Sequence, residues 1–173
     1  MTTAISSRRL TDLLRLLAVL ETLHQRLAKV LAAKLQAVRD ADMHAAASLA
    51  PEEQAVASRI QEQDGLRRQL MDVIGVELGL PARAGRTLTI SQLSSKVRDD
   101  QCVLLGKAAD RLMREASRVA SASRVLGQTC RGVLHHLEWV SASLRPRQDK
   151  PQGYSGAGRP VAPCDAKVFE TIG

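Results

Sequence analysis

The residues of this chain whose side chains could do chemistry are few and widely separated. Its four histidines and three cysteines (Cys102, Cys130 and Cys164) form no CxxC pair and no cluster with metal-ligand spacing. His135 and Glu138 stand three residues apart, which supplies two ligands where a zinc site needs three or four. Nothing in the sequence supports a Cys-His nucleophilic pair. We therefore expect no metal, no cofactor and no enzymatic activity.

The glycines do not form a nucleotide-binding loop. Gly106-Lys107 lacks the earlier glycine that a phosphate-cradling loop requires, because Gln101 stands at that position. The Gly156-Ala157-Gly158 run is followed by Arg159-Pro160-Val161, so it does not continue into a dinucleotide fingerprint. These absences favour a binding function over a catalytic one.

The side chains best suited to protein binding are the aromatic ones, and all of them lie in the last quarter of the chain. They are Trp139, Tyr154 and Phe169, and tryptophan and tyrosine are enriched among residues that carry binding energy. At 100° per residue, Trp139 lies about 140° around its helix from the apolar seam described below. It either docks against another part of this chain or contacts a partner, and Phe169 is either a contact point or part of a frayed terminus.

Two apolar seams predict the helices that position these residues. In each, apolar or small residues recur at steps of three and four, the a/d rhythm of helices that pack lengthwise. Additional leucines beside the first seam indicate more than one partner helix. The first seam is Leu10, Leu13, Leu17, Leu20, His24, Leu27, Leu31, Lys34 and Val38; the second is Leu112, Ala116, Val119, Ser123, Leu126, Cys130, Val133, Leu137, Val140 and Leu144.

Prolines, glycines and capping residues divide the chain into three helical stretches and a tail. We expect helices over about residues 6–49, 51–78 and 89–145, the last either broken by Gly106 or continuous through it. Residues 146–173 hold four of the six prolines and are predicted to be disordered. The fold class is therefore all-α, an elongated antiparallel helical hairpin or bundle with coiled-coil packing.

This division predicts two parts of different character. Residues 1–145 form the helical hairpin or bundle domain, and residues 146–173 form a flexible Pro/Gly-rich tail. Aromatic residues make up only 2% of the chain and hydrophobic residues 45%, mostly Leu, Ala and Val, which is typical of long helices.

The charge distribution limits the classes of partner. The chain carries a net charge of +7, but residues 51–80 are acidic at −3 between basic flanks, so this segment is expected to lie against basic helices. No Lys/Arg block is longer than two, which argues against nucleic acid as a partner. No apolar stretch reaches the roughly 18 residues of a membrane span. Three cysteines without a disulfide framework favour the reducing cytoplasm.

Four short runs, taken in order, resemble the FlgN-type flagellar export chaperones. After the leucine-rich first helix come Arg39-Asp40-Ala41-Asp42-Met43-His44-Ala45 and then Pro51-Glu52-Glu53. Glu77-Leu78-Gly79-Leu80-Pro81 ends the second stretch, and Tyr154-Ser155-Gly156-Ala157-Gly158-Arg159 lies in the tail. Two departures are the basic net charge and the segment after Arg159, which matches no pattern of the family.

The resemblance implies a small cytoplasmic protein that binds flagellar hook-associated junction proteins, which join hook to filament, before their secretion. Such a protein would guard a C-terminal helical segment of its client and deliver it to the flagellar export apparatus. The resemblance implies no catalytic residues in this sequence. What carries over is a binding region, whose residues here are Leu126, Val133, Leu137, Trp139, Val140, Leu144, Tyr154 and Phe169.

Two other functions fit the same residues. A coiled-coil adaptor would self-associate through the seams, and a basic helical protein would bind nucleic acid with steep salt dependence. The wide apolar faces and the tail's few basic residues favour the chaperone. On this interpretation, Trp139→Ala with removal of residues 150–173 weakens client capture, whereas a charge at Leu126 or Leu137 damages the fold.

Overall fold

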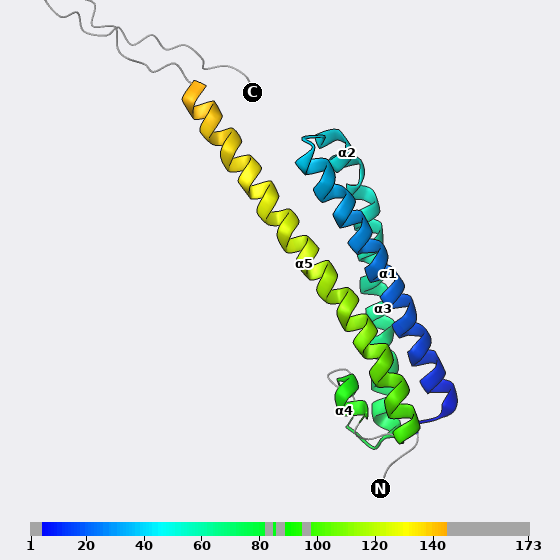
Figure 1. The fold of residues 1–173 in the computed structure, drawn as a ribbon. Coiled ribbons are helices and arrows are strands. Elements are labelled where there is room, and N and C mark those ends of the chain that lie inside the picture. Colours follow the sequence, from blue (N-terminus) through cyan, green and yellow to red (C-terminus); the bar gives the residue numbers. More distant parts are fainter. Residues whose placement is uncertain (1–4, 82–84, 86–88, 95–97, 145–173) are drawn as a thin grey trace, which may run out of the picture. The chain divides into compact units, whose positions relative to one another are not determined.

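The chain folds into helices throughout the part that the structure describes (Figure 1). The computed structural model describes residues 5–81, 85, 89–94 and 98–144. Its helices are α1 (Ser7–Arg39), α2 (Met43–Ser48), α3 (Ala50–Glu77), α4 (Ile90–Ser94) and α5 (Asp99–Leu144). Within these ranges there is no strand, which confirms the all-α fold.

The chain divides into two compact units, Met1–Gly132 and Val133–Gly173, which are described separately. The first contains α1 to α4 and most of α5. In the second, the described residues are the last helical turns of α5. The predicted tail, residues 146–173, lies outside the described residues, so the proposed domain boundary at 145 stays a prediction.

Ion pairs set α1 and α3 antiparallel. Arg9, near the start of α1, pairs with Glu77 at the end of α3. Towards the other end, Lys34 Nζ lies 2.7 Å from a carboxylate oxygen of Glu53, in the first turn of α3. This confirms that the acidic second segment lies against a basic helix, and it makes α1 and α3 the antiparallel hairpin of the fold.

Leucines of the first seam form the core of the Met1–Gly132 unit. Leu13 and Leu17 are 0% and 1% exposed, and each such burial is worth about 1.5–3 kcal/mol. They pack with residues from three other helices, so α1 has more than one partner, as its wide apolar face predicts. The buried cluster contains Ile5, Leu10, Leu13, Leu17, Met71, Ile74, Leu93, Leu105 and Ala108.

Two contacts set the direction of α5 in this unit. The Gln101 side-chain amide donates to the carbonyl oxygen of Ile5 over 3.3 Å, and ten residues later Arg111 Nε lies 3.2 Å from a carboxylate oxygen of Glu21. Because the contacts advance together along both helices, the start of α5 runs parallel to α1. The helix of the first seam and the start of the helix of the second seam therefore run parallel, because α3 reverses the chain between them. The antiparallel hairpin predicted from the sequence is formed by α1 with α3, and not by the two helices that carry the seams.

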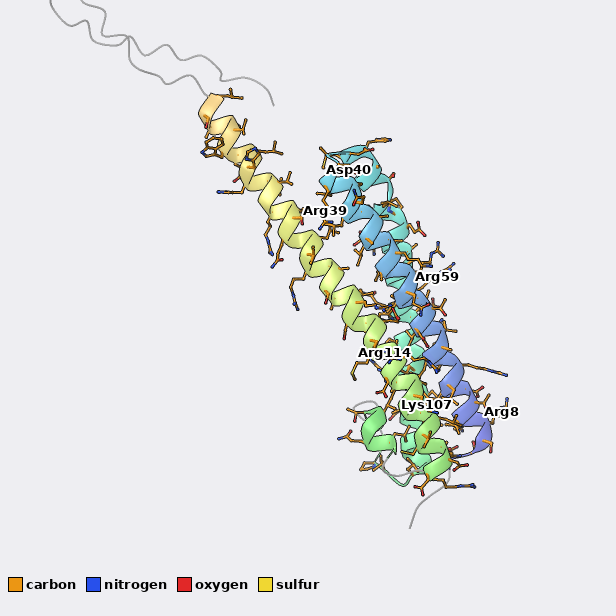
Figure 2. All side chains as sticks on the ribbon, in the orientation of Figure 1. Arg8, Arg39, Asp40, Arg59, Lys107 and Arg114 are labelled. Carbon is orange, nitrogen blue, oxygen red and sulfur yellow. The ribbon has the colours of Figure 1, made fainter. Side chains whose placement is uncertain are left out.

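The stretch predicted as one helix over residues 6–49 is divided at its end. The helix α1 stops at Arg39, and Figure 2 shows Arg39 and Asp40 at this turn. Ala41 follows with φ = 57°, in the left-handed region, and Asp42 then caps α2 by accepting a hydrogen bond from the Ala45 backbone N–H over 2.8 Å. Aspartate is among the strongest N-cap residues, so a new helix begins where the periodicity alone suggested a continuous one.

Candidate partner-binding site

The helix α5 positions six of the eight predicted binding residues. It is continuous from Asp99 to Leu144, so Gly106 is tolerated rather than a break. Along the seam, Leu126 is the last residue of α5 that is buried, at 8% exposure. The remaining predicted residues, Tyr154 and Phe169, lie outside the described part of the chain.

Beyond Leu126 the same seam is open to solvent. Val133 and Val140 are half-buried, whereas Leu137 and Leu144 are 57% and 77% exposed. The expectation that a charge at Leu137 damages the fold is therefore not supported by its position. The four-three rhythm continues through Leu144, but the residues at its end have no cover among the described parts of the chain.

Trp139 is 64% exposed, although it is the largest apolar side chain of the protein. Its ring stacks on the His136 imidazole of its own helix, with centroids 6.1 Å apart and planes inclined by 25°. Its backbone carbonyl accepts a hydrogen bond from the Ser143 hydroxyl over 2.8 Å. The side chain is thus held against its own helix and leaves most of its surface available.

Leu134 extends this exposed apolar surface and was missed from the sequence. It is 60% exposed and stands one residue after the seam position Val133, so the four-three rhythm does not include it. The available signal was its place in the stretch from Val133 to Leu144, which is rich in apolar residues and contains one charged residue. We define the distal α5 surface as the apolar side chains around the end of α5, which are the seam residues Val133, Leu137, Val140 and Leu144 together with Leu134 and Trp139 on either side of the seam.

The distal α5 surface carries almost no charge. Between Val133 and Leu144 the only Lys, Arg, Asp or Glu is Glu138. Large exposed apolar side chains in such a setting are typical of surfaces that bind other proteins. The chemistry available here is burial of hydrocarbon against a partner, not ion pairing or catalysis.

The remaining polar and sulfur groups do not assemble into a reactive centre in the described ranges. No three His, Cys, Asp or Glu side chains there are placed to hold a metal ion. Cys102 and Cys130 are half-buried free thiols of α5. None of the described helices combines the length and hydropathy that crossing a membrane requires.

Comparison with known proteins identifies the family. The model of the family described as FlgN protein matches residues 1–162. No curated protein and no solved structure is significantly similar to the chain. The match covers the five described helices and extends into the tail, beyond the distal α5 surface. The chain therefore belongs to the FlgN family of flagellar export chaperones.

Proposed function

We propose that this protein binds hook-filament junction proteins in the cytoplasm and keeps them competent for flagellar secretion. The client segment is a C-terminal helix that lies on the distal α5 surface. The observation that carries the proposal is the exposure of Leu137, Trp139 and Leu144 on a helix segment with a single charged residue. Membership of the FlgN family is the reason for assigning this binding to flagellar export.

The physical basis is recognition of one helix by another. An amphipathic client helix contributes apolar anchors at three- and four-residue spacing, which is the spacing of the exposed seam on α5. Covering a leucine side chain fully is worth about 1.5–3 kcal/mol. Trp139, about 140° around α5 from the seam, adds a larger area through contact with the chain that flanks the client helix. A few such anchors, less the cost of ordering the client, give binding that is firm and still reversible.

Tyr154 and Phe169 are proposed to complete the site from the tail. A segment that orders only when the client is present makes extra contacts and loses conformational entropy, so it adds area without making release slow. The tail residues and the distal α5 surface together form the predicted binding region between Leu126 and Phe169. Delivery to the export apparatus then follows release of the client helix.

The experiment uses Trp139 as its own reporter, because it is the only tryptophan of the chain. Full-length protein is titrated with a synthetic peptide of a junction protein's C-terminal helix while tryptophan emission is recorded. Burial of the indole is expected to shift the emission to shorter wavelength. Leu137→Asp should weaken binding at least about tenfold, since a charge then faces the apolar client.

Val103→Asp is the matched control, because Val103 is also on α5 and is 54% exposed, against 57% for Leu137. It should bind the peptide as the unaltered protein does. Trp139→Ala combined with removal of residues 150–173 should lose capture of the client and keep its helical content by circular dichroism. Capture that survives both changes unaltered would place the site elsewhere.

The two competing functions give different results in the same preparation. A coiled-coil adaptor would form homodimers in sedimentation experiments, and Leu137→Asp would dissociate them without any client. A nucleic-acid binder would retain DNA or RNA and lose it steeply with added salt. The chaperone forms a defined complex with its client that resists salt, because the distal α5 surface carries almost no charge.

A further inference from the structure

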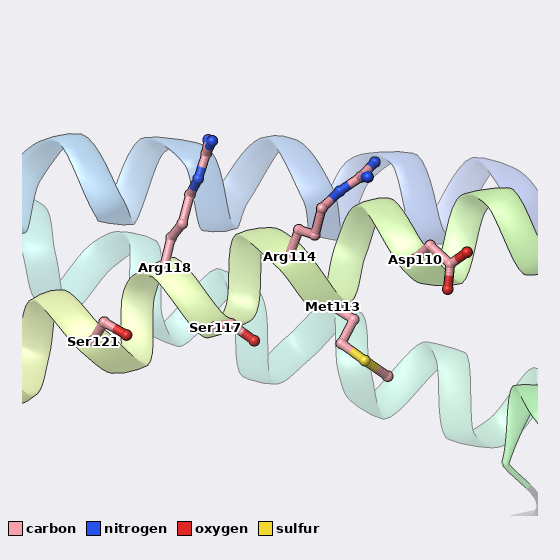
Figure 3. Close-up of a pocket in the computed structure, with 6 residues that line it drawn as sticks. All are labelled: Asp110, Met113, Arg114, Ser117, Arg118 and Ser121. Atoms are coloured by element: carbon pink, nitrogen blue, oxygen red, sulfur yellow. The ribbon is translucent and has the colours of Figure 1, made fainter.

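A second surface lies earlier on α5, in the Met1–Gly132 unit. It is a shallow, widely open depression on one face of α5, and all of its lining residues come from this helix. They follow one another at helical spacing over about three turns. We call it the α5 groove; it is lined by Asp110, Met113, Arg114, Ser117, Arg118 and Ser121 (Figure 3). It shares no residue with the distal α5 surface.

One side of the groove is built of arginine. Arg114 and Arg118 extend from α5 in the same direction (Figure 3). In the described ranges Arg114 has no ion-pair partner, whereas Arg118 Nη1 lies 3.1 Å from a Glu115 carboxylate oxygen on its own helix. The Arg118 side chain is 72% exposed. Both guanidinium groups therefore have donors left for an incoming carboxylate.

The middle of the groove consists of two small serines and one apolar methionine. Ser117 and Ser121 stand four residues apart and leave the low floor into which the ridge of another helix can pack. Met113, which is 67% exposed, borders them and offers a flexible apolar contact. A partner helix lying here would bring its backbone close to Ser117 and Ser121 and would place apolar side chains against Met113.

The charges of the groove match a partner with a particular pattern. Arg114 and Arg118 are separated by about 6 Å along the helix axis, as are two carboxylates four residues apart on another helix. Asp110, one turn before Arg114, repels a further acid at that end and favours a basic residue there. We infer that the α5 groove docks an acidic amphipathic helix of a partner protein, which carries Glu or Asp at i and i+4 beside an apolar residue.

Other occupants fit these charges less well. Nucleic acid would meet the Asp110 carboxylate and would gain nothing from Met113. A second copy of this chain has its acidic helix α3 already engaged, since Glu53 and Glu77 pair with α1 and Asp64 pairs with arginines of α3. The chain's net charge of +7 also opposes self-association and favours an acidic partner.

The test follows methionine methyl groups of the full chain by NMR. The probe is a synthetic helical peptide of about 18 residues, roughly 27 Å long, with Glu at i and i+4 beside a leucine. The Met113 methyl signal should shift saturably. The signals of Met71, which is fully buried, and Met43, which is 49% exposed on α2, should not move.

Substitution of the two arginines identifies the charges responsible. Arg114→Glu with Arg118→Glu should weaken peptide binding at least about tenfold at low salt. If the first variant folds poorly, Arg114→Gln with Arg118→Gln replaces it, because glutamine introduces no repulsion with Glu115. This second variant should also bind the peptide more weakly than the unaltered protein does. Arg59→Glu with Arg131→Glu is the control of equal charge change on exposed residues outside the groove, and it should bind normally.

Three results would overturn the inference. The first is equal binding of the peptide with Gln in place of both Glu residues. The second is unchanged binding by both groove variants. The third is a Met113 shift produced by a 20-base-pair DNA duplex at lower concentration than by the acidic peptide, which would make the groove a nucleic-acid site. Binding of junction-protein peptides to the distal α5 surface is measured separately, so either proposal can fail alone.

Discussion

A Cβ atom on Gly75 would lie 2.9 Å from the Cα atom of Gly85. Gly75 is a buried residue of α3, and Gly85 belongs to the connection between α3 and α4 and is also buried. A Cβ atom on Gly85 would overlap the backbone of α3 at the carbonyl oxygen of Met71. Two backbones thus meet at a distance that only a pair of glycines permits, and this fixes the connection against α3.

The first prediction concerns this contact. Gly75→Ala should destabilise the protein by about 1–3 kcal/mol, because the added methyl group pushes the connection off α3. Gly65→Ala, in the same helix, should instead stabilise it by about 0.5–1 kcal/mol, since nothing lies within 4 Å of its Cβ position and alanine is the better helix former. Urea unfolding followed by circular dichroism measures both. Equal effects of the two substitutions would contradict the close contact.

The second prediction separates the covered part of the α5 seam from the open part. Leu126→Asp should cost about 2–4 kcal/mol of unfolding free energy, because it buries a charge at a position that is 8% exposed. Leu137→Asp, at 57% exposure, should cost about 1 kcal/mol or less. Thermal unfolding of the two variants side by side tests this. A large loss for Leu137→Asp would show that its side chain is covered in solution.

The third prediction uses the Asp64 carboxylate of α3. Burial alone would raise the pKa of Asp64, but the hydrogen bond from Arg67 and the charges of Arg67 and Arg68 outweigh it and lower the pKa below 3.8. The Arg67 Nε to Asp64 Oδ1 distance is 2.8 Å. A carboxyl group whose pKa falls on folding stabilises the native state above its unfolded pKa.

The Asp64 contribution is therefore present at neutral pH and is lost as pH falls through the native pKa. Asp64→Asn should reduce stability at pH 7 by less than about 1 kcal/mol, because the pairs are partly exposed. The difference from the unaltered protein should shrink as pH falls below 4. Glu62→Gln, an exposed change on the same helix, should show no such trend. A difference that grows on acidification would reverse the proposed sign.

The fourth prediction tests the cap that begins α2. Asp42→Ala should cost about 1 kcal/mol, since it removes the acceptor of the Ala45 N–H. Asp40→Ala should be near neutral, because Asp40 accepts from the Gln36 side chain at 3.0 Å on an exposed surface and sits at the negative end of α1. Urea midpoints compare them. Equal losses would mean that the Asp42 cap contributes nothing specific.

Helices were predictable from the sequence because their signals are local. The leucine rhythm from Leu10 to Val38 identified α1 and its buried face, and the Gly79-Pro81 stop marked the end of α3 to within two residues. The division at Ala41 was not predictable from periodicity, because the apolar rhythm passes through it. Asp42 was the available signal, as a capping residue inside an expected helix.

The candidate binding site was also only partly predictable from the sequence. The sequence identified Trp139 and the seam through Leu144 as candidates, since aromatic residues and a/d spacing can be read directly from the amino-acid sequence. It gave Leu126 and Leu137 the same expected environment, because both stand at seam positions. It also did not reveal the α5 groove, whose serines and arginines look like an ordinary solvated helix face.

By itself, the sequence determined the helical class and the positions of the long helices, and it supplied the region that we propose for client binding. The tertiary structure decided the parallel course of α1 and the start of α5, the contact of Gly75 with Gly85, and the difference in cover between Leu126 and Leu137. The reason is physical. Helical periodicity depends on neighbours three and four residues apart, whereas direction, close approach and cover depend on residues distant in the chain.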